Sequence, residues 1–154
     1  MEPKFLADSM AGRLARWLRT IGYDALYEDR PERGDDAMAE QARAEGRILL
    51  TRDHLITPRP GLKMLVLRSE APEDQLLEVV RELGLKPDPA RRFTRCTLCN
   101  GLLARLPREE GLAEAPPRVR ALKTDFFRCP ACLKLYWFGT HTEATVRRLE
   151  ELGL

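Results

Sequence analysis

Residues 4–22 read KFLADSMAGRLARWLRTIG, in which a short apolar run passes directly into an amphipathic repeat. Residues 4–7 have the character of a short buried strand that ends at Asp8. The apolar positions after it recur at helical spacing; they are Met10, Leu14, Trp17, Leu18 and Ile21. Gly22 then ends the predicted helix. The stretch is therefore predicted to form a strand followed by a helix.

The same alternation continues along the chain. Further strands are predicted at 24–27, 47–51 and 62–67, with helices between Asp35 and Gly46 and over 72–83. Alternating strands and helices favour an α/β fold, a parallel sheet flanked by helices on both faces. A linker at 85–92, rich in proline and charge, separates this first domain, residues 1–85, from a module at 93–154 that closes with a short helix.

The module contains all four cysteines of the chain, in the pairs Cys96-Thr-Leu-Cys99 and Cys129-Pro-Ala-Cys132. Each pair places two thiolates on one tight turn, and two such turns together make a tetrahedral zinc site with four cysteine ligands. The alternatives are two disulfides, a thioredoxin-type redox motif or inert buried thiols. Two pairs with no cysteine elsewhere favour one zinc per chain, held in a small zinc ribbon. Four protein ligands leave no position for water, so this zinc is predicted to be structural.

Composition and charge limit the classes of function that the chain can have. The 154 residues are 44% hydrophobic and 32% charged, and the apolar runs are too short to span a membrane. The first residues lack a signal peptide, so we expect a cytoplasmic protein with reduced thiols. Residues 1–85 carry 13 basic and 16 acidic side chains, whereas 86–154 carry 13 and 8. A basic module beside an acidic domain suits a polyanionic substrate, although both surfaces could simply be solvated.

Three carboxylates are predicted at the carboxyl edge of the sheet. Asp8 follows the first strand, Asp53 follows the third, and Asp36 opens the second helix, where Asp35 and Glu40 are alternatives. Functional groups of open α/β sheets gather at this edge. Grouped carboxylates repel one another unless a cation lies between them, and hard oxygen ligands favour Mg²⁺ or Mn²⁺. Such a site would bind a catalytic metal. The alternative is that Asp8 and Asp36 cap helices and Asp53 ends a strand.

These motifs resemble the PIN-like ribonuclease family named for the C-terminal domain of Mutator-seven exonucleases. The first half of the resemblance is carried by FLADSMAGRLARWLR at 5–19, GYD at 22–24, the Asp35-Asp36 pair and RILLTRD at 47–53. The second half is carried by the cysteine pairs, Asn100, FRC at 127–129 and YWFGTH at 136–141. The resemblance covers nearly the whole chain. It implies a PIN-type sheet, an acidic site for a divalent metal and RNA cleavage.

Basic side chains are the candidates for RNA contacts. Arg13 and Arg16 lie away from the apolar stripe of the first helix, Arg91 and Arg92 precede the first cysteine pair, and His141 follows the second pair. Each could equally belong to a solvated surface.

The predicted function is a ribonuclease that uses Mg²⁺ or Mn²⁺ to hydrolyse RNA phosphodiester bonds, with Asp8, Asp36 and Asp53 as metal ligands. In this prediction the zinc ribbon aids RNA binding. The alternatives are a non-catalytic RNA-binding adaptor of the same fold and a redox protein that uses the Cys-x-x-Cys pairs.

Overall fold

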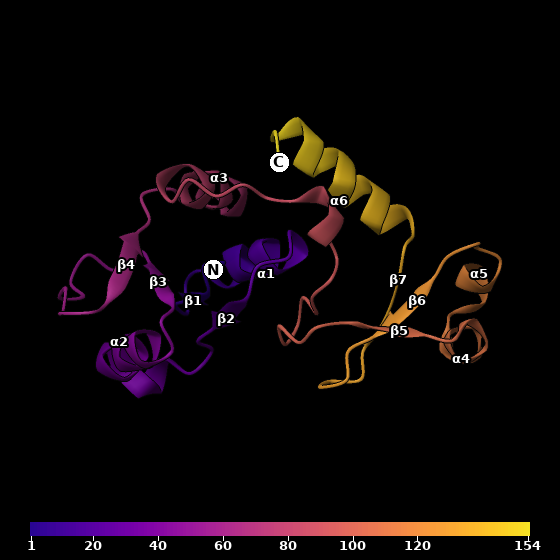
Figure 1. Cartoon of the computed structure of the whole chain (residues 1–154), viewed down its shortest axis with the longest axis horizontal. Helices are drawn as coiled ribbons and strands as arrows, with labels where there is room; N and C mark the ends of the chain where they lie inside the picture. Colours follow the sequence, from indigo (N-terminus) through magenta and orange to yellow (C-terminus); the bar gives the residue numbers. More distant parts are fainter. The chain divides into compact units, whose positions relative to one another are not determined.

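In a computed structural model that describes residues 1–154, the chain divides into two compact units, Met1–Asn100 and Gly101–Leu154 (Figure 1). The first unit contains a four-stranded sheet in which every neighbouring pair is parallel. Its strands are β1 (Phe5–Ala7), β2 (Ala25–Tyr27), β3 (Ile48–Thr51) and β4 (Lys63–Val66), in the order β2-β1-β3-β4. The predicted parallel α/β sheet is confirmed.

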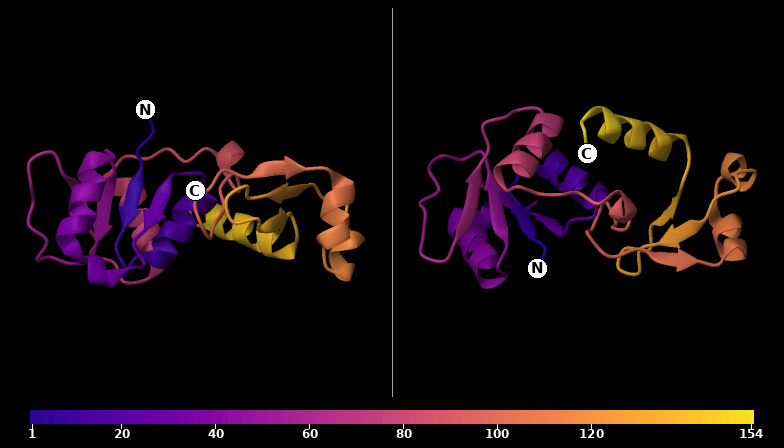
Figure 2. Two further views of the ribbon diagram at one scale, coloured as in Figure 1. Left: turned by 90° about the horizontal axis from the view of Figure 1, so that it is seen from below. Right: turned by 45° about the horizontal axis from the view of Figure 1, so that its top comes forward.

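Helices cover both faces of this sheet. They are α1 (Gly12–Thr20), α2 (Gly34–Ala44) and α3 (Pro72–Glu82). Helices α1 and α3 pack together on one face, and α2 lies on the other, as the two views of Figure 2 show. The chain goes from β1 outward to β2 and then back past β1 to β3. Because such crossovers are right-handed, the reversal places α1 and α2 on opposite faces.

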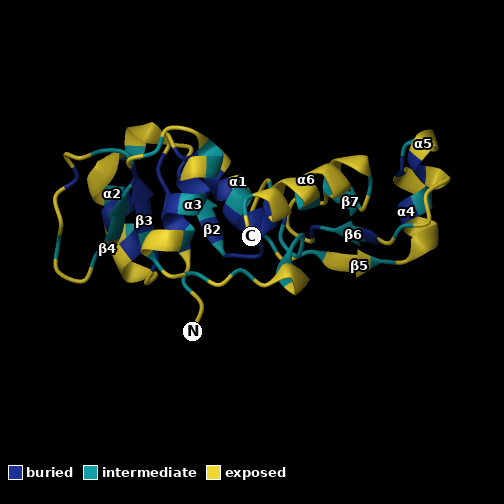
Figure 3. Cartoon of the chain, turned by 90° about the horizontal axis from the view of Figure 1, so that it is seen from above, coloured by how far each residue is buried: buried dark blue, intermediate teal, exposed yellow.

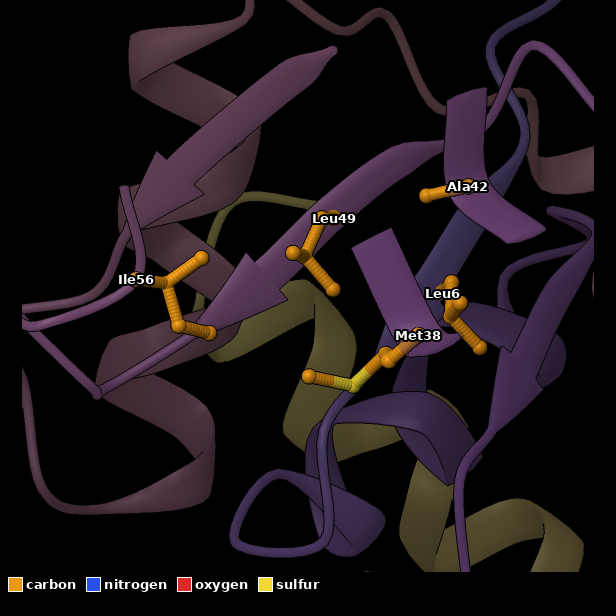
Figure 4. Packing of buried hydrophobic residues seen from close by; sticks show 5 residues of the cluster. All are labelled: Leu6, Met38, Ala42, Leu49 and Ile56. Carbon is orange, nitrogen blue, oxygen red and sulfur yellow. The ribbon is translucent and has the colours of Figure 1, made fainter. Parts of the chain in front are cut away.

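The strand register sorts the apolar side chains between the two faces. Leu6 of β1 pairs with Leu49 of β3, and both are buried. They pack with Met38 and Ala42 of α2 and with Ile56, as Figure 4 shows. Neighbouring strand residues point to the opposite face. Figure 3 shows the result: β3 is largely buried, whereas the outer side of α2 is exposed.

The second unit has a three-stranded antiparallel sheet in the order β5-β6-β7, formed by β5 (Ala104–Leu106), β6 (Phe126–Arg128) and β7 (Leu135–Trp137). Its helices are α4 (Arg108–Glu114), α5 (Pro117–Arg120) and α6 (Thr140–Glu151). Phe126, Ala115 and Val119 form its small core, against which Trp137 also packs. A Cβ on Gly111 would lie 2.2 Å from the Phe126 ring, so only glycine permits α4 to approach β6 this closely.

Every strand and helix predicted for the first unit is present, with ends that differ by one or two residues. Strand β5 and helices α4 and α5 were not predicted, because their short segments carry too little periodicity. The proposed functional division into 1–85 and 93–154 stays a prediction. No helix of the chain has both the length and the apolar character that a membrane span needs.

Candidate functional site

The sheet reverses its strand order at one place, between β1 and β3. Helices α1 and α2 lie on opposite faces, and the carboxyl ends of β1 and β3 lie where open α/β sheets form a ligand crevice. Asp8 is the first residue after β1, and Asp53 is the second residue after β3. The sequence-predicted aspartates therefore lie where an open α/β sheet places its ligand site.

Asp8 is nearly buried, and the neighbouring strand fixes its carboxylate. Its Oδ2 accepts a hydrogen bond of 2.5 Å from the Thr51 hydroxyl and another of 3.3 Å from the Arg52 N–H. Its Oδ1 accepts a hydrogen bond of 3.0 Å from the Met10 N–H at the start of the α1 segment. The Thr51 hydroxyl also accepts the N–H of Asp53 at 2.9 Å. One threonine hydroxyl thus holds the carboxylate of Asp8 and the backbone of Asp53 together.

A cavity of about 140 Å³ opens beside Asp8. Four acidic residues line it: Asp8, Glu28, Asp35 and Asp53. We call it the acidic cavity. Arg30 also lines it and contributes one positive charge. A site of this composition attracts cations, because hard carboxylate oxygens are the ligands that Mg²⁺ and Mn²⁺ prefer.

The second helix contributes Asp35 to this cavity rather than Asp36. Asp36, the predicted ligand, is 87% exposed and forms an ion pair with Arg59. Glu40, the other alternative, is exposed and pairs with Arg43 at 2.8 Å. Adjacent helical residues point about 100° apart, so one of two neighbouring aspartates faces the cavity while the other faces away. The structure therefore brings together Asp8, Asp35 and Asp53, and it leaves Asp36 outside.

Two residues of the site were missed from the sequence: Glu28, which lines the cavity, and Thr51, which lies behind Asp8. Glu28 is the first residue after β2, and its N–H donates to the Ala7 carbonyl, so it lies level with Asp8. A carboxylate directly after a strand was the signal for Asp8 and Asp53, and the same signal applied to Glu28. Thr51 is wholly buried at the end of β3. A hydroxyl residue at the end of an apolar strand, two residues before Asp53, could have identified it.

The four cysteines form a second candidate site. Their sulfur atoms all lie within 4.8 Å of one another, as one tetrahedral metal requires. The two turns share one backbone pattern: the Asn100 N–H donates to the Cys96 carbonyl, and the Leu133 N–H donates to the Cys129 carbonyl, both at 2.9 Å. Asn100 and Leu133 both have positive φ, 71° and 65°. At the second turn, Leu133 adopts the left-handed backbone that glycine favours. The cluster suits zinc, because four thiolates are a typical zinc ligand set.

The first cysteine turn is part of the first unit and is fixed there by buried polar groups. Arg19 of α1 is 5% exposed and donates to the carbonyls of Thr97 and Leu98 at 2.9 and 3.0 Å. Asn100 accepts the Ala25 N–H at 3.0 Å and donates to the Asp24 carboxylate at 2.8 Å. Burial would raise the pKa of Asp24, but hydrogen bonds from Arg47 and Asn100 outweigh it and lower this pKa.

The predicted RNA contacts differ in their surroundings. Arg13 and Arg16 are exposed on α1, and His141 is exposed in the first turn of α6. Arg91 is half-buried, donates to the Gly22 carbonyl at 2.9 Å and pairs with Glu2. Arg92 is also half-buried. Arg91 is therefore engaged in packing within the first unit, whereas Arg13, Arg16 and His141 face solvent.

Comparison with known proteins agrees with the sequence resemblance. No curated protein and no solved structure matches the chain. The family model described as the Mut7-C RNAse domain matches residues 3–149, which include both the acidic cavity and the cysteine cluster. Over nearly its whole length, the chain thus belongs to the Mut7-C RNAse domain family.

Proposed function

We propose that the chain is a ribonuclease that hydrolyses RNA phosphodiester bonds in the acidic cavity with Mg²⁺ or Mn²⁺. The observation that carries the proposal is the grouping of Asp8, Asp35 and Asp53 in one cavity at the carboxyl edge of the sheet. Asp36, named from the sequence, is replaced by Asp35 in this proposal. Membership of a family of RNase domains supports RNA as the substrate.

The donor set fits a hard divalent cation. Asp8, Asp35 and Asp53 would hold it with carboxylate oxygens, and the cavity is large enough for an ion with some of its waters. When bound, such a metal activates water and offsets negative charge on a phosphate. Asp8 is held by Thr51 and by two backbone N–H groups, so its carboxylate is oriented before any cation arrives. This preorganisation reduces the reorganisation that binding and reaction require.

The test is cleavage of a panel of structured and unstructured RNAs, with and without Mn²⁺. We expect Mn²⁺-dependent cleavage by the parent protein and none by the Asp8→Asn and Asp53→Asn variants, with normal melting and normal RNA binding. Asparagine keeps the size of the side chain but is a poor anionic ligand. Variants that cut as fast as the parent would refute the assignment. RNA binding by a parent protein that never cleaves would indicate the non-catalytic adaptor instead.

We also propose that exposed basic side chains aid RNA binding, through contacts that weaken as salt concentration rises. Arg13 and Arg16 are the clearest test, because both are exposed. Substitutions of Arg91 and Arg92 are a less direct test, since loss of the hydrogen bond between Arg91 and the Gly22 carbonyl also disturbs packing. The double variant Arg13→Gln, Arg16→Gln is expected to bind RNA more weakly and to show a shallower salt dependence. An unchanged RNA affinity of this double variant at low salt would show that Arg13 and Arg16 do not contribute to RNA binding.

The cysteine cluster completes the proposal as a structural zinc site that shapes the cysteine-bearing ribbon. The four sulfur atoms are close enough to share one ion, and Cys96 and Cys129 are buried. Zinc with four thiolates has no open position for water, so we assign it no part in the hydrolysis.

A further inference from the structure

The backbone between β2 and α2 determines where Asp35 lies. Asp35 is exposed and belongs to the first turn of α2, so the position of its carboxylate depends on the chain that leads into the helix. That chain runs from Glu28 through a 3-10 turn at Pro31–Arg33 to Gly34, which has a φ of 74°. Any displacement of this loop would move Asp35 relative to Asp8 and Asp53.

Glu28 holds this loop with both carboxylate oxygens. Its side chain is only 6% exposed. Oε1 accepts the Arg30 N–H at 2.9 Å, and Oε2 accepts from the Arg33 guanidinium at 2.6 Å. The same Arg33 nitrogen donates to the side chain of Gln41, in α2, at 3.0 Å. Glu28 is therefore connected through Arg33 to the helix that carries Asp35.

The backbone of Glu28 is held by the neighbouring strand β1. Its N–H donates to the Ala7 carbonyl at 2.9 Å, directly before Asp8. The residue thus joins the strand that presents Asp8 to the loop that presents Asp35. These contacts give Glu28 a position from which one side chain can set the separation of two proposed metal ligands.

A fourth acidic residue in the cavity could instead be a ligand itself. The contacts argue against that role, because a cation on the Glu28 oxygens would lie close to the Arg33 guanidinium and be repelled by it. The outer partners of metal ligands commonly act by orientation, and their loss typically lowers metal affinity or activity.

We propose that Glu28, with Arg33, is a positioning residue of the acidic cavity and not a metal ligand. This inference rests on the proposed function, since it assigns to Glu28 the placement of Asp35 for RNA hydrolysis. The two roles predict opposite behaviour for Arg33. If Glu28 positions Asp35, loss of Arg33 reproduces loss of Glu28. If Glu28 is a ligand, loss of Arg33 leaves metal affinity unchanged or raises it.

The experiment is a double-mutant cycle with Glu28→Gln, Arg33→Gln and the two combined, read out as Mn²⁺ affinity and as the single-turnover rate of RNA cleavage. Each single variant is expected to lose about tenfold in both, and the double variant to lose no more than either one. Arg33→Lys keeps a positive donor toward Glu28 and is expected to recover part of the loss. Arg81→Gln, which removes an exposed arginine of α3, is the matched control and is expected to behave as the parent.

The outcomes separate the two proposals. Reduced Mn²⁺ affinity in Glu28→Gln with unchanged or higher affinity in Arg33→Gln would overturn the positioning role and make Glu28 a ligand. Parent-like affinity and rate in both single variants would also overturn it, while leaving the ribonuclease intact. A parent protein that neither binds Mn²⁺ nor cuts RNA would refute the proposed function itself. If Glu28→Gln does not fold, the two Arg33 variants carry the test, because Arg33 is 30% exposed.

Discussion

At the last position of β3, the Thr51 side chain makes two hydrogen bonds with a single hydroxyl. It donates to Asp8 and accepts the N–H of Asp53, in a place wholly closed to solvent. A buried polar group of this kind is costly when it loses its partner. Thr51 therefore connects the geometry of two proposed metal ligands to the end of one strand.

Replacement of Thr51 by valine tests this connection, because valine keeps the shape and removes the hydroxyl. We expect Thr51→Val to lose about 1–3 kcal/mol of stability, since the Asp53 N–H is left without an acceptor. Its Mn²⁺ affinity is also expected to fall, because Asp8 is no longer oriented. Thr51→Ser keeps the hydroxyl and is the control. Thermal melting and Mn²⁺ titration that leave Thr51→Val equal to the parent would exclude the bridging role.

Some residues of the acidic site could be predicted from the sequence, and others could not. Asp8 and Asp53 were predictable because each comes just after an apolar strand whose end is easily located. The choice between Asp35 and Asp36 was not, because it depends on the rotation of α2 about its axis. That rotation is set by tertiary packing of Met38 and Ala42 against the sheet, which sequence periodicity fixes only roughly.

Among the elements, the first cysteine turn depends on the sheet for its support. Asn100 satisfies the N–H of Ala25 and the carboxylate of Asp24, and its own backbone is left-handed. The spacing of the cysteines predicted the turn, but not its anchoring on α1 and β2. Contacts between residues more than 70 positions apart leave no periodic signal in a single sequence.

Two substitutions at Asn100 separate its hydrogen bonds from its backbone. Asn100→Gly removes the buried side chain but permits the positive φ, and we expect a loss of about 1–3 kcal/mol in the first unit. Asn100→Ala adds backbone strain and is expected to cost about 1 kcal/mol more. Chemical denaturation of the metal-loaded protein measures both. Equal stability of the glycine variant and the parent would show that the side-chain bonds contribute nothing.

Glu78 of α3 binds the connection that leads from β4, and its carboxyl group has a strongly shifted pKa. Burial would raise the pKa of Glu78, but hydrogen bonds from the N–H groups of Arg68 and Ser69 outweigh it and lower this pKa from 4.5 to about 2. Because the pKa of Glu78 is lower in the folded than in the unfolded chain, its ionised carboxylate stabilises the fold at pH values above about 4.5. This stabilisation is lost as pH falls from about 4.5 toward 2.

We therefore expect Glu78→Gln to be less stable than the parent at neutral pH, by at most about 3 kcal/mol. The difference should shrink as pH falls from about 5 to 2, because the parent carboxylate becomes protonated over this range. Denaturation curves at several pH values measure the effect. A difference that stays constant across this range would show that the charge of Glu78 is not what stabilises this connection.

In the whole molecule, the two units differ in construction: the first has a parallel sheet and the second a small antiparallel one. The parallel sheet of the first unit was predictable, because strands and helices alternate with clear periodicity. In the second unit, β5, α4 and α5 were not, since these short segments carry too little periodicity. Its small core suggests that bound metal contributes much of its stability.

Zinc removal tests that dependence. We expect one zinc per chain, and we expect chelation to abolish hydrogen-exchange protection in β6 and β7 while β1 and β3 stay protected. Structural zinc typically contributes about 10–16 kcal/mol in small metal-binding modules. Cys99→Ser is expected to behave like the chelated protein. Reduced, unchelated protein without zinc, or full protection of β6 and β7 after its removal, would contradict this expectation.

The central claim, that the acidic cavity cuts RNA, is tested most directly by comparing Asp35→Asn with Asp36→Asn in one single-turnover cleavage assay with Mn²⁺. The two variants make the same chemical change at adjacent positions of α2, but only Asp35 lines the cavity. We predict that Asp35→Asn loses about a hundredfold or more in rate and that Asp36→Asn keeps most of it. Cleavage that survives in Asp35→Asn, or that is lost only in Asp36→Asn, would contradict the account.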